Sequence, residues 1–161
     1  MADQWIENHK RDTWRRQAKA SGYRARSAFK LKQIQDRFEI LRKGDTVLDV
    51  GCHPGGWTQV AVEEVGQSGF VLGVDLLSTS PVQGAQIIIG DIKSESTIEE
   101  IDRMLDGRML NVLISDISPR LTGRYDTDQA ISLELSTMVL DAAMPILSPG
   151  GTFVTKIFQG V

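Results

Sequence analysis

The residues that first suggest chemistry form a glycine-rich loop in the stretch TVLDVGCHPGGWTQV, residues 46–60. A β-branched, apolar run leads into the loop, and a helix-like segment follows it. Glycines let a backbone approach a ligand closely, and Pro54 stiffens the turn while removing one N–H donor. Gly51 and Gly55 do not have the G-x-G-x-x-G spacing of a dinucleotide site, and no Gly-Lys-Ser/Thr follows as in a P-loop. The loop therefore favours a ligand that lies flat against the backbone over one held by a pyrophosphate.

Acidic residues follow the next two strand-like runs. Asp75 stands 24 residues beyond Gly51, where an acid in nucleotide-binding folds accepts both hydroxyls of a ribose. Asp91, in GDI, can accept a hydrogen bond from the exocyclic amine of an adenine, and Asp49 can hold the backbone of the loop. A ribose, an adenine and little phosphate together describe S-adenosylmethionine. The alternative is that the glycines only turn the chain and Asp75 only ends a strand, but the agreement of three strand ends favours the cofactor.

The residues near the fourth strand limit the methyl acceptor. Methylation of a ring carbon through a covalent adduct needs a cysteine beside this strand, and the single cysteine, Cys52, lies in the glycine loop instead. The stretch SDISPRLTG after the strand has one proline and no aromatic residue, which argues against the exocyclic nitrogen of a base. A hydroxyl group is therefore the expected acceptor.

Two lysines and one carboxylate are the candidate acceptor site. A hydroxyl acceptor must lose its proton, and a lysine whose pKa is lowered by burial and a nearby cation can take it beside an orienting carboxylate. Lys156 lies inside the apolar run FVTKIF, Lys30 lies in an apolar part of the first helix, and Asp116 ends the fourth strand. Taken singly, each lysine can instead extend its charged end to solvent. Together, the three residues are expected to form a catalytic set.

Strand-like and helix-like segments alternate along the chain. The strand-like segments are continuous apolar runs, and the helix-like segments are amphipathic. Such alternation predicts a parallel sheet covered by helices on both faces, so the predicted fold class is α/β with a doubly wound sheet. The expected strands are residues 46–50, 69–76, 85–91, 109–116 and 151–158, and the expected helices are residues 27–41, 56–65, 96–105 and 127–147.

The first 32 residues are basic although the whole chain has a net charge of −3. They hold nine Lys/Arg against three acids, with Trp5, Trp14 and Tyr23 interleaved. Cations neutralise phosphates and aromatic rings stack on unpaired bases, so this composition favours RNA, although a solvated amphipathic tail is the alternative. We expect residues 1–24 to form a basic arm and residues 25–161 to form the domain. The expected RNA-binding residues are Arg15, Arg16, Lys19, Arg24 and Arg26.

Length and composition are ordinary for one globular domain, with 161 residues, 41% hydrophobic and 24% charged. No apolar run approaches the ~20 residues of a membrane span, and the polar N-terminus does not resemble a secretory signal. One cysteine cannot form an internal disulfide, which fits a reducing cytoplasm, and the few histidines and cysteines form no visible metal cluster. We expect a cytoplasmic monomer that holds no metal ion.

The ordered motifs resemble those of a known family. GYRARSAFKL, DVGCHPGGWTQ, GVDLL, GDI, SDISP and KIFQG, spread over residues 21–161, are similar to the successive motifs of the FtsJ-type ribosomal RNA 2′-O-methyltransferases. The resemblance implies a Rossmann-like class I methyltransferase fold with S-adenosylmethionine as donor. It also implies a ribose 2′-hydroxyl as acceptor, in 23S-type large-subunit ribosomal RNA at a uridine. The implied cofactor contacts are Gly55, Trp57, Asp75, Asp91 and Asp116, in addition to the loop residues Gly51 and Pro54.

The same resemblance implies a Lys-Asp-Lys-Glu catalytic set. Lys30, Asp116 and Lys156 match its first three members, and Lys156 is the expected proton acceptor. Family members continue past KIFQG with a helix and two strands that carry the final glutamate, so the domain is expected to be incomplete at its C-terminus. Transfer RNA is an alternative substrate, and a catalytically impaired RNA-binding or ribosome-assembly module is an alternative function. A viral-type cap methyltransferase and a nicotinamide-dependent oxidoreductase are less favoured.

Overall fold

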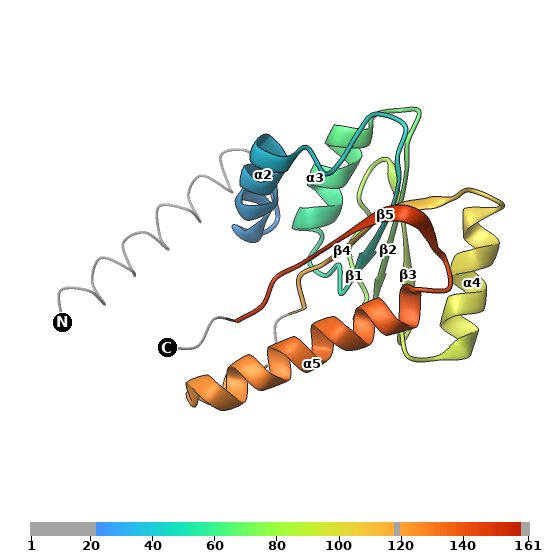
Figure 1. Ribbon diagram of the computed structural model, residues 1–161. Coiled ribbons are helices and arrows are strands. Elements are labelled where there is room, and N and C mark those ends of the chain that lie inside the picture. Colours follow the sequence, from blue (N-terminus) through green and yellow to red (C-terminus); the bar gives the residue numbers. More distant parts are fainter. Residues whose placement is uncertain (1–21, 118–119, 159–161) are drawn as a thin grey trace.

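The computed structural model describes residues 22–117 and 120–158, which form one all-parallel, five-stranded sheet with helices on both faces (Figure 1). The strand order is β3-β2-β1-β4-β5, so the first strand lies at the centre of the sheet. This arrangement is the doubly wound α/β fold that the alternating segments predicted. None of the described helices is long and apolar enough to cross a membrane. The strands are β1 (Thr46–Val50), β2 (Phe70–Asp75), β3 (Ala85–Ile89), β4 (Leu110–Ser115) and β5 (Leu147–Thr155), and the helices are α2 (Ser27–Phe38), α3 (Gly56–Val65), α4 (Glu95–Leu105) and α5 (Tyr125–Ala143).

Each face of the sheet packs against its own pair of helices (Figure 1). Within the fully buried β1, Val47 shares a core with α2 and α3, whereas Leu48 shares the opposite core with α4 and α5. The two side chains separate because successive residues of a strand point to opposite faces of the sheet. Burial on both faces explains why the central strands are continuous apolar runs in the sequence.

The C-terminal helix and strand are shifted from their predicted positions, whereas β1 and α3 have the predicted bounds. α5 ends at Ala143, because Pro145 follows closely and cannot continue a helical hydrogen-bond pattern. The stretch SPGG, residues 148–151, therefore lies inside β5 instead of before it. The register between β4 and β5 shifts at this point, as it does at a β-bulge.

This shift corrects the predicted position of Lys156. β5 ends at Thr155, so Lys156 follows the strand directly instead of lying inside it. Its backbone N–H still donates to the carbonyl oxygen of Ser115 at 3.2 Å, which continues the pairing with β4. Its side chain is 50% exposed, so the cost of burying an ammonium group does not arise.

The packed domain begins before residue 25, the predicted boundary. Tyr23 is buried in the core that includes α2 and α3, and its hydroxyl donates to Glu63 Oε2 at 2.6 Å. Its ring also meets Phe29 edge to face, with 5.7 Å between the ring centroids. The predicted arm residues Arg15, Arg16 and Lys19 lie outside the described residues.

A buried amide shapes the connection between α2 and the central strand. Gln35 Nε2 donates to the carbonyl oxygen of Leu41 at 2.7 Å, and the N–H of Leu41 donates to Gln35 Oε1 at 2.8 Å. Both bonds lie in buried surroundings, where an unpaired backbone group is costly. The side chain of Gln35 therefore replaces the backbone partners that Leu41 lacks outside a helix or strand.

We expect Gln35→Leu to lower the free energy of unfolding by about 1–3 kcal/mol, because it leaves two buried backbone groups of Leu41 without partners. Urea denaturation of the purified protein measures this change. Gln33→Leu is the matched control, since Gln33 is exposed on the same helix. Equal effects of the two substitutions would show that the Gln35 pair does not stabilise the fold.

Candidate functional site

The glycine loop turns the chain sharply out of the centre of the sheet. The N–H groups of Gly51 and Cys52 both donate to the carbonyl oxygen of Val74, at 2.8 and 3.2 Å. Gly51 has a φ of +74°, which L side chains rarely adopt, and a Cβ there would collide with the side chain of Ile117. Gly55, with a φ of +116°, then starts α3. The loop is thus enclosed between the end of β2 and the segment that follows β4.

The carboxylate of Asp75 connects this loop to the loop after β2. Oδ2 accepts from the N–H of His53 at 2.9 Å, and Oδ1 accepts from the N–H of Leu77 at 2.8 Å. Each carboxylate oxygen has a second lone pair, so both can still accept a hydroxyl. Asp75 is therefore arranged to hold two loops together and to receive a ribose between them.

A cavity of about 410 Å³ lies at the carboxyl ends of the central strands, where parallel α/β sheets bind ligands. Asp75, Asp91 and Asp116 offer carboxylates at its wall, and Ile117, Leu135 and Met138 are among the residues that offer apolar surface. Asp91 lies two residues beyond β3, and its Oδ1 accepts from the N–H of Lys93 at 3.0 Å. This size is within the usual range for a small-molecule site. The lining residues are Val50, Gly51, His53, Val74, Asp75, Leu76, Leu77, Gly90, Asp91, Ile92, Lys93, Asp116, Ile117, Leu135 and Met138.

The carboxylates that line this cavity fit S-adenosylmethionine. Acids occur at the carboxyl ends of β2, β3 and β4, and the predicted ribose acceptor, Asp75, and the predicted amine acceptor, Asp91, line one cavity. Asp116 Oδ1 is buried and makes no hydrogen bond to the described residues, although Lys156 Nζ lies 3.3 Å from it as the partner of an ion pair. No group of three or more His, Cys, Asp or Glu among the described residues is placed to hold a metal ion.

Two further cavities extend from this one toward the predicted lysines. The second, of about 260 Å³, shares Gly51, His53 and Asp116 with the first and is also lined by Lys156. The third, of about 450 Å³, is lined by Lys156 and Lys30. The fold therefore brings the predicted catalytic residues to one side of the predicted cofactor site.

Lys156 and Asp116 form an ion pair between the two sites. Lys156 Nζ lies 3.3 Å from Asp116 Oδ1, and the Asp116 side chain is 15% exposed. The two residues follow β5 and β4, which are neighbours in the sheet. Asp116 thus holds the amine of Lys156 at the second cavity, which lies between the cofactor cavity and the third cavity.

Asp49 has a different role from the predicted one. Its Oδ2 accepts from the hydroxyl of Thr58 on α3 at 2.7 Å, while Oδ1 makes no hydrogen bond to the described residues. It therefore ties β1 to α3 and does not hold the loop backbone. Burial, followed by the charges of Asp116 and Asp75, raises the pKa of Asp49 to about 7, although the bond from Thr58 lowers it. The sequence offers no signal for the Asp49–Thr58 pair.

Burial also makes the loop cysteine unreactive. It raises the pKa of Cys52 to about 12, so the thiol stays protonated near neutral pH. The Sγ atom is packed near Gly73 of β2, where an added Cβ would lie 2.9 Å from it. This environment agrees with the expectation that the chain does not form a covalent adduct through Cys52.

Arg24, which was predicted to bind RNA, is exposed and bonds to backbone carbonyl groups of this chain. Its guanidinium donates to the carbonyl oxygens of Pro54 at 3.2 Å, of Ser80 at 2.5 Å and of Pro81. Three carbonyls from two loops therefore occupy this cation, whose planar set of donors suits such a cluster. Arg26 is also exposed, and it lines both cavities that Lys156 lines.

Trp57 and Pro54 lie apart from the main cofactor cavity. Trp57 is buried, and its Nε1 donates to the carbonyl oxygen of Ser27 at 2.8 Å, which joins α3 to the start of α2. Both residues line the second cavity, beside Asp116 and Lys156. Contact of either residue with the cofactor stays a prediction.

We expect Asp49→Asn to flatten the pH dependence of stability. A raised pKa means that the folded protein keeps a proton that the unfolded chain releases above its ordinary pKa of 3.8, so the free energy of unfolding falls as pH rises toward about 7. Above that pH the contribution is constant. Between pH 5 and 7.5 the free energy of unfolding should fall by about 2 kcal/mol more for the wild type than for the variant.

Chemical denaturation across this pH range tests the expectation. Asp36→Asn is the matched control, because Asp36 is exposed on α2. Identical pH profiles for the wild type and Asp49→Asn would mean that Asp49 is ionised throughout the range.

Comparison with known proteins agrees with this geometry. The profile of the FtsJ-like methyltransferase family matches residues 23–161. The ribosomal RNA large subunit methyltransferase E of Methanothrix thermoacetophila is 50% identical over 150 residues, which cover 93% of this chain and 58% of the relative. The protein of the same name from Chromobacterium violaceum is 40% identical over 99% of this chain and 78% of its own length.

A solved structure is also similar. The crystal structure of a Plasmodium falciparum protein assigned as a ribosomal RNA methyltransferase superposes with a TM-score of 0.79 at 25% identity, covering 86% of this chain and 80% of that one. The chain spans less than two thirds of the Methanothrix relative. The family match nevertheless covers most of the chain and includes every residue of the candidate site. The chain belongs to the FtsJ-like methyltransferase family.

Proposed function

We propose that this chain transfers a methyl group from S-adenosylmethionine to a ribose 2′-hydroxyl of RNA, with a uridine of 23S-type large-subunit ribosomal RNA as substrate. The observation that carries the proposal is the Lys156–Asp116 ion pair of 3.3 Å at the second cavity, between the cofactor cavity and the third cavity lined by Lys156 and Lys30. The names of the relatives, which are ribosomal RNA methyltransferases, support RNA as the substrate.

The proposed roles follow from the position of each side chain. When bound, S-adenosylmethionine would supply an electrophilic methyl group on a positively charged sulfur. Asp75 would hold its ribose hydroxyls and Asp91 its adenine amine, so that the reactive end points toward Asp116. Lys156, after its ammonium has released a proton to solvent, would accept the proton of the 2′-hydroxyl as the oxygen bonds to the methyl carbon and the carbon–sulfur bond breaks, and Asp116 would keep the amine in place.

Lys30 and Arg26 would guide the RNA into the site. Both are exposed, and both line the third cavity with Lys156. Cations on the wall of an open cavity attract the phosphates of the RNA backbone and set its position. The predicted arm residues Arg15, Arg16 and Lys19 would extend this positive surface, while Arg24 would act by holding the glycine loop.

We expect Lys156→Ala to reduce methyl transfer at least about 100-fold, the usual contribution of a general base, with little change in affinity for S-adenosylmethionine. Lys156→Arg should be equally inactive, because arginine can keep the pair with Asp116 but cannot accept a proton. Single-turnover transfer and isothermal titration measure the two quantities. Lys43→Ala, at an exposed lysine that contacts Glu63, is the control. Full activity of Lys156→Arg would overturn the proton-acceptor role.

We expect Asp75→Ala to weaken S-adenosylmethionine binding by about 1–3 kcal/mol, the cost of leaving hydrogen-bond partners unpaired. Since Asp75 also holds two loops, a ligand cycle separates the two roles. A cofactor analogue that lacks a ribose hydroxyl should bind the wild type more weakly than the cofactor does, but should bind Asp75→Ala as well as the cofactor. If the analogue binds more weakly than the cofactor by the same factor in the wild type and in Asp75→Ala, the ribose contact is refuted.

Labelled methyl transfer to total RNA and to ribosomal subunits tests the proposed function itself. A 2′-O-methyl group blocks alkaline cleavage of the adjacent backbone bond, so label should appear in alkali-resistant dinucleotides. Transfer RNA fractions distinguish the alternative substrate. Cofactor binding without incorporation into any RNA would contradict the proposal.

A further inference from the structure

A stacked pair of aromatic rings, one exposed and one half-buried, lies near the proposed acceptor site. The rings of Tyr125 and Phe158 are nearly parallel, at 10°, with 6.1 Å between their centroids. Tyr125 is the first residue of α5 and is 57% exposed. Phe158 follows β5, and Figure 1 shows this segment leaving the sheet on the side where α5 begins. Neither residue lines the three cavities of the candidate site.

The backbone near each ring bonds to a buried polar side chain. The N–H of Phe158 donates to Oγ of the buried Ser132 at 2.8 Å, which fixes the segment after β5 against α5. On the other side, Asp128 accepts from the N–H and hydroxyl of Thr122, each at 2.8 Å, and from the N–H of Gly123 at 3.2 Å. These bonds lower the pKa of Asp128 and join its carboxylate to the loop that precedes α5. The backbone beside each ring is therefore held in place, and the two rings contact each other.

The surroundings of the pair are suited to a nucleic acid. Phe158 is two residues beyond Lys156, so the chain between them spans at most ~7 Å. Arg120 and Arg124 are exposed just before Tyr125, and neither forms an ion pair with another described residue. An aromatic pair can stack on a base while the two nearby arginines bind its phosphates.

We propose that the Tyr125–Phe158 pair is a stacking platform for an unpaired base next to the nucleotide whose ribose reaches Lys156. The proposal rests on the proposed function and adds to it the requirement that this neighbouring base be free of a helix. An aromatic face stacks on any base, so the platform would fix the position of the RNA without reading its sequence. Arg120 and Arg124 would pair with the flanking phosphates.

The test compares two single-stranded probes of equal charge and length, oligouridylate and the same oligomer with abasic riboses. Wild-type protein should bind oligouridylate more tightly, because stacking favours the probe with bases. Tyr125→Leu, which keeps apolar area but removes the ring, should reduce this preference several-fold or more, while Tyr125→Phe should retain it. Fluorescence anisotropy at fixed salt measures both affinities.

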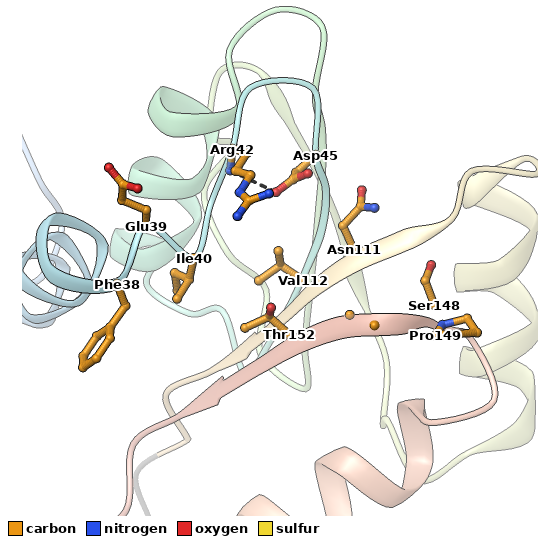
Figure 2. A pocket seen from close by; sticks show the side chains of 12 residues that line it. Phe38, Glu39, Ile40, Arg42, Asp45, Asn111, Val112, Ser148, Pro149 and Thr152 are labelled. Atoms are coloured by element: carbon orange, nitrogen blue, oxygen red, sulfur yellow. Dashed lines mark hydrogen bonds between the residues drawn. The ribbon is translucent and has the colours of Figure 1, made fainter.

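A distant aromatic residue provides the matched control. Phe38 is 63% exposed at the end of α2 and lines a cavity beside the first residues of β4 and β5, together with Glu39 and Ile40 (Figure 2), whereas Phe158 follows the carboxyl end of β5. Phe38→Leu therefore removes an exposed ring without touching the platform, and it should leave the preference unchanged. Thermal denaturation of all variants verifies that they are folded.

The outcomes separate the platform from the proposed function. An unchanged preference in Tyr125→Leu, or an equal loss of affinity for both probes, overturns the platform even if the protein methylates RNA. If Tyr125→Leu loses the preference but the wild type transfers no methyl group, the platform stands and the proposed function fails.

Discussion

The carboxylate of Asp75 joins the two loops on which the whole candidate site depends. By accepting the N–H groups of His53 and Leu77, it sets the spacing between the turn after β1 and the turn after β2. Those turns form much of the wall of the cofactor cavity, and the guanidinium of Arg24 braces them from outside through the carbonyls of Pro54 and Ser80. One acid and one arginine thus give the loops a defined shape.

Polar side chains also hold the helices to the sheet. Asp49 bonds Thr58 across the interface of β1 with α3, and Gln35 supplies both backbone partners of Leu41 before β1 begins. On the neighbouring β4, Asn111 Oδ1 accepts from the N–H of Thr46 at the start of β1, at 2.7 Å. Buried polar pairs of this kind add little net energy but permit few alternative arrangements, because each lost partner is costly. The central strand therefore has one defined position between its neighbours.

The acceptor side is built differently from the cofactor side. Its groups are exposed or half-exposed, and they come from the start of α2, the ends of β4 and β5, and the start of α5. An open, positively charged surface suits a large polyanion better than a small substrate that must be enclosed. The contrast between an acidic cavity and a basic surface, which meet at Lys156 and Asp116, supports the proposed function, in which a small methyl donor meets an RNA acceptor.

The sequence by itself determined the sheet, the glycine loop and the order of the acids along it. β1 and α3 were predicted with their observed bounds, because burial on both faces leaves a continuous apolar run and the glycines mark where it must turn. Boundaries that depend on a bulge, such as the start of β5, were not predictable in this way. The tertiary structure alone decided that Arg24 bonds Pro81, that Lys156 pairs with Asp116 and that Tyr125 stacks on Phe158. Each of these contacts joins residues more than thirty positions apart, and local propensity carries no information about which distant atoms will meet.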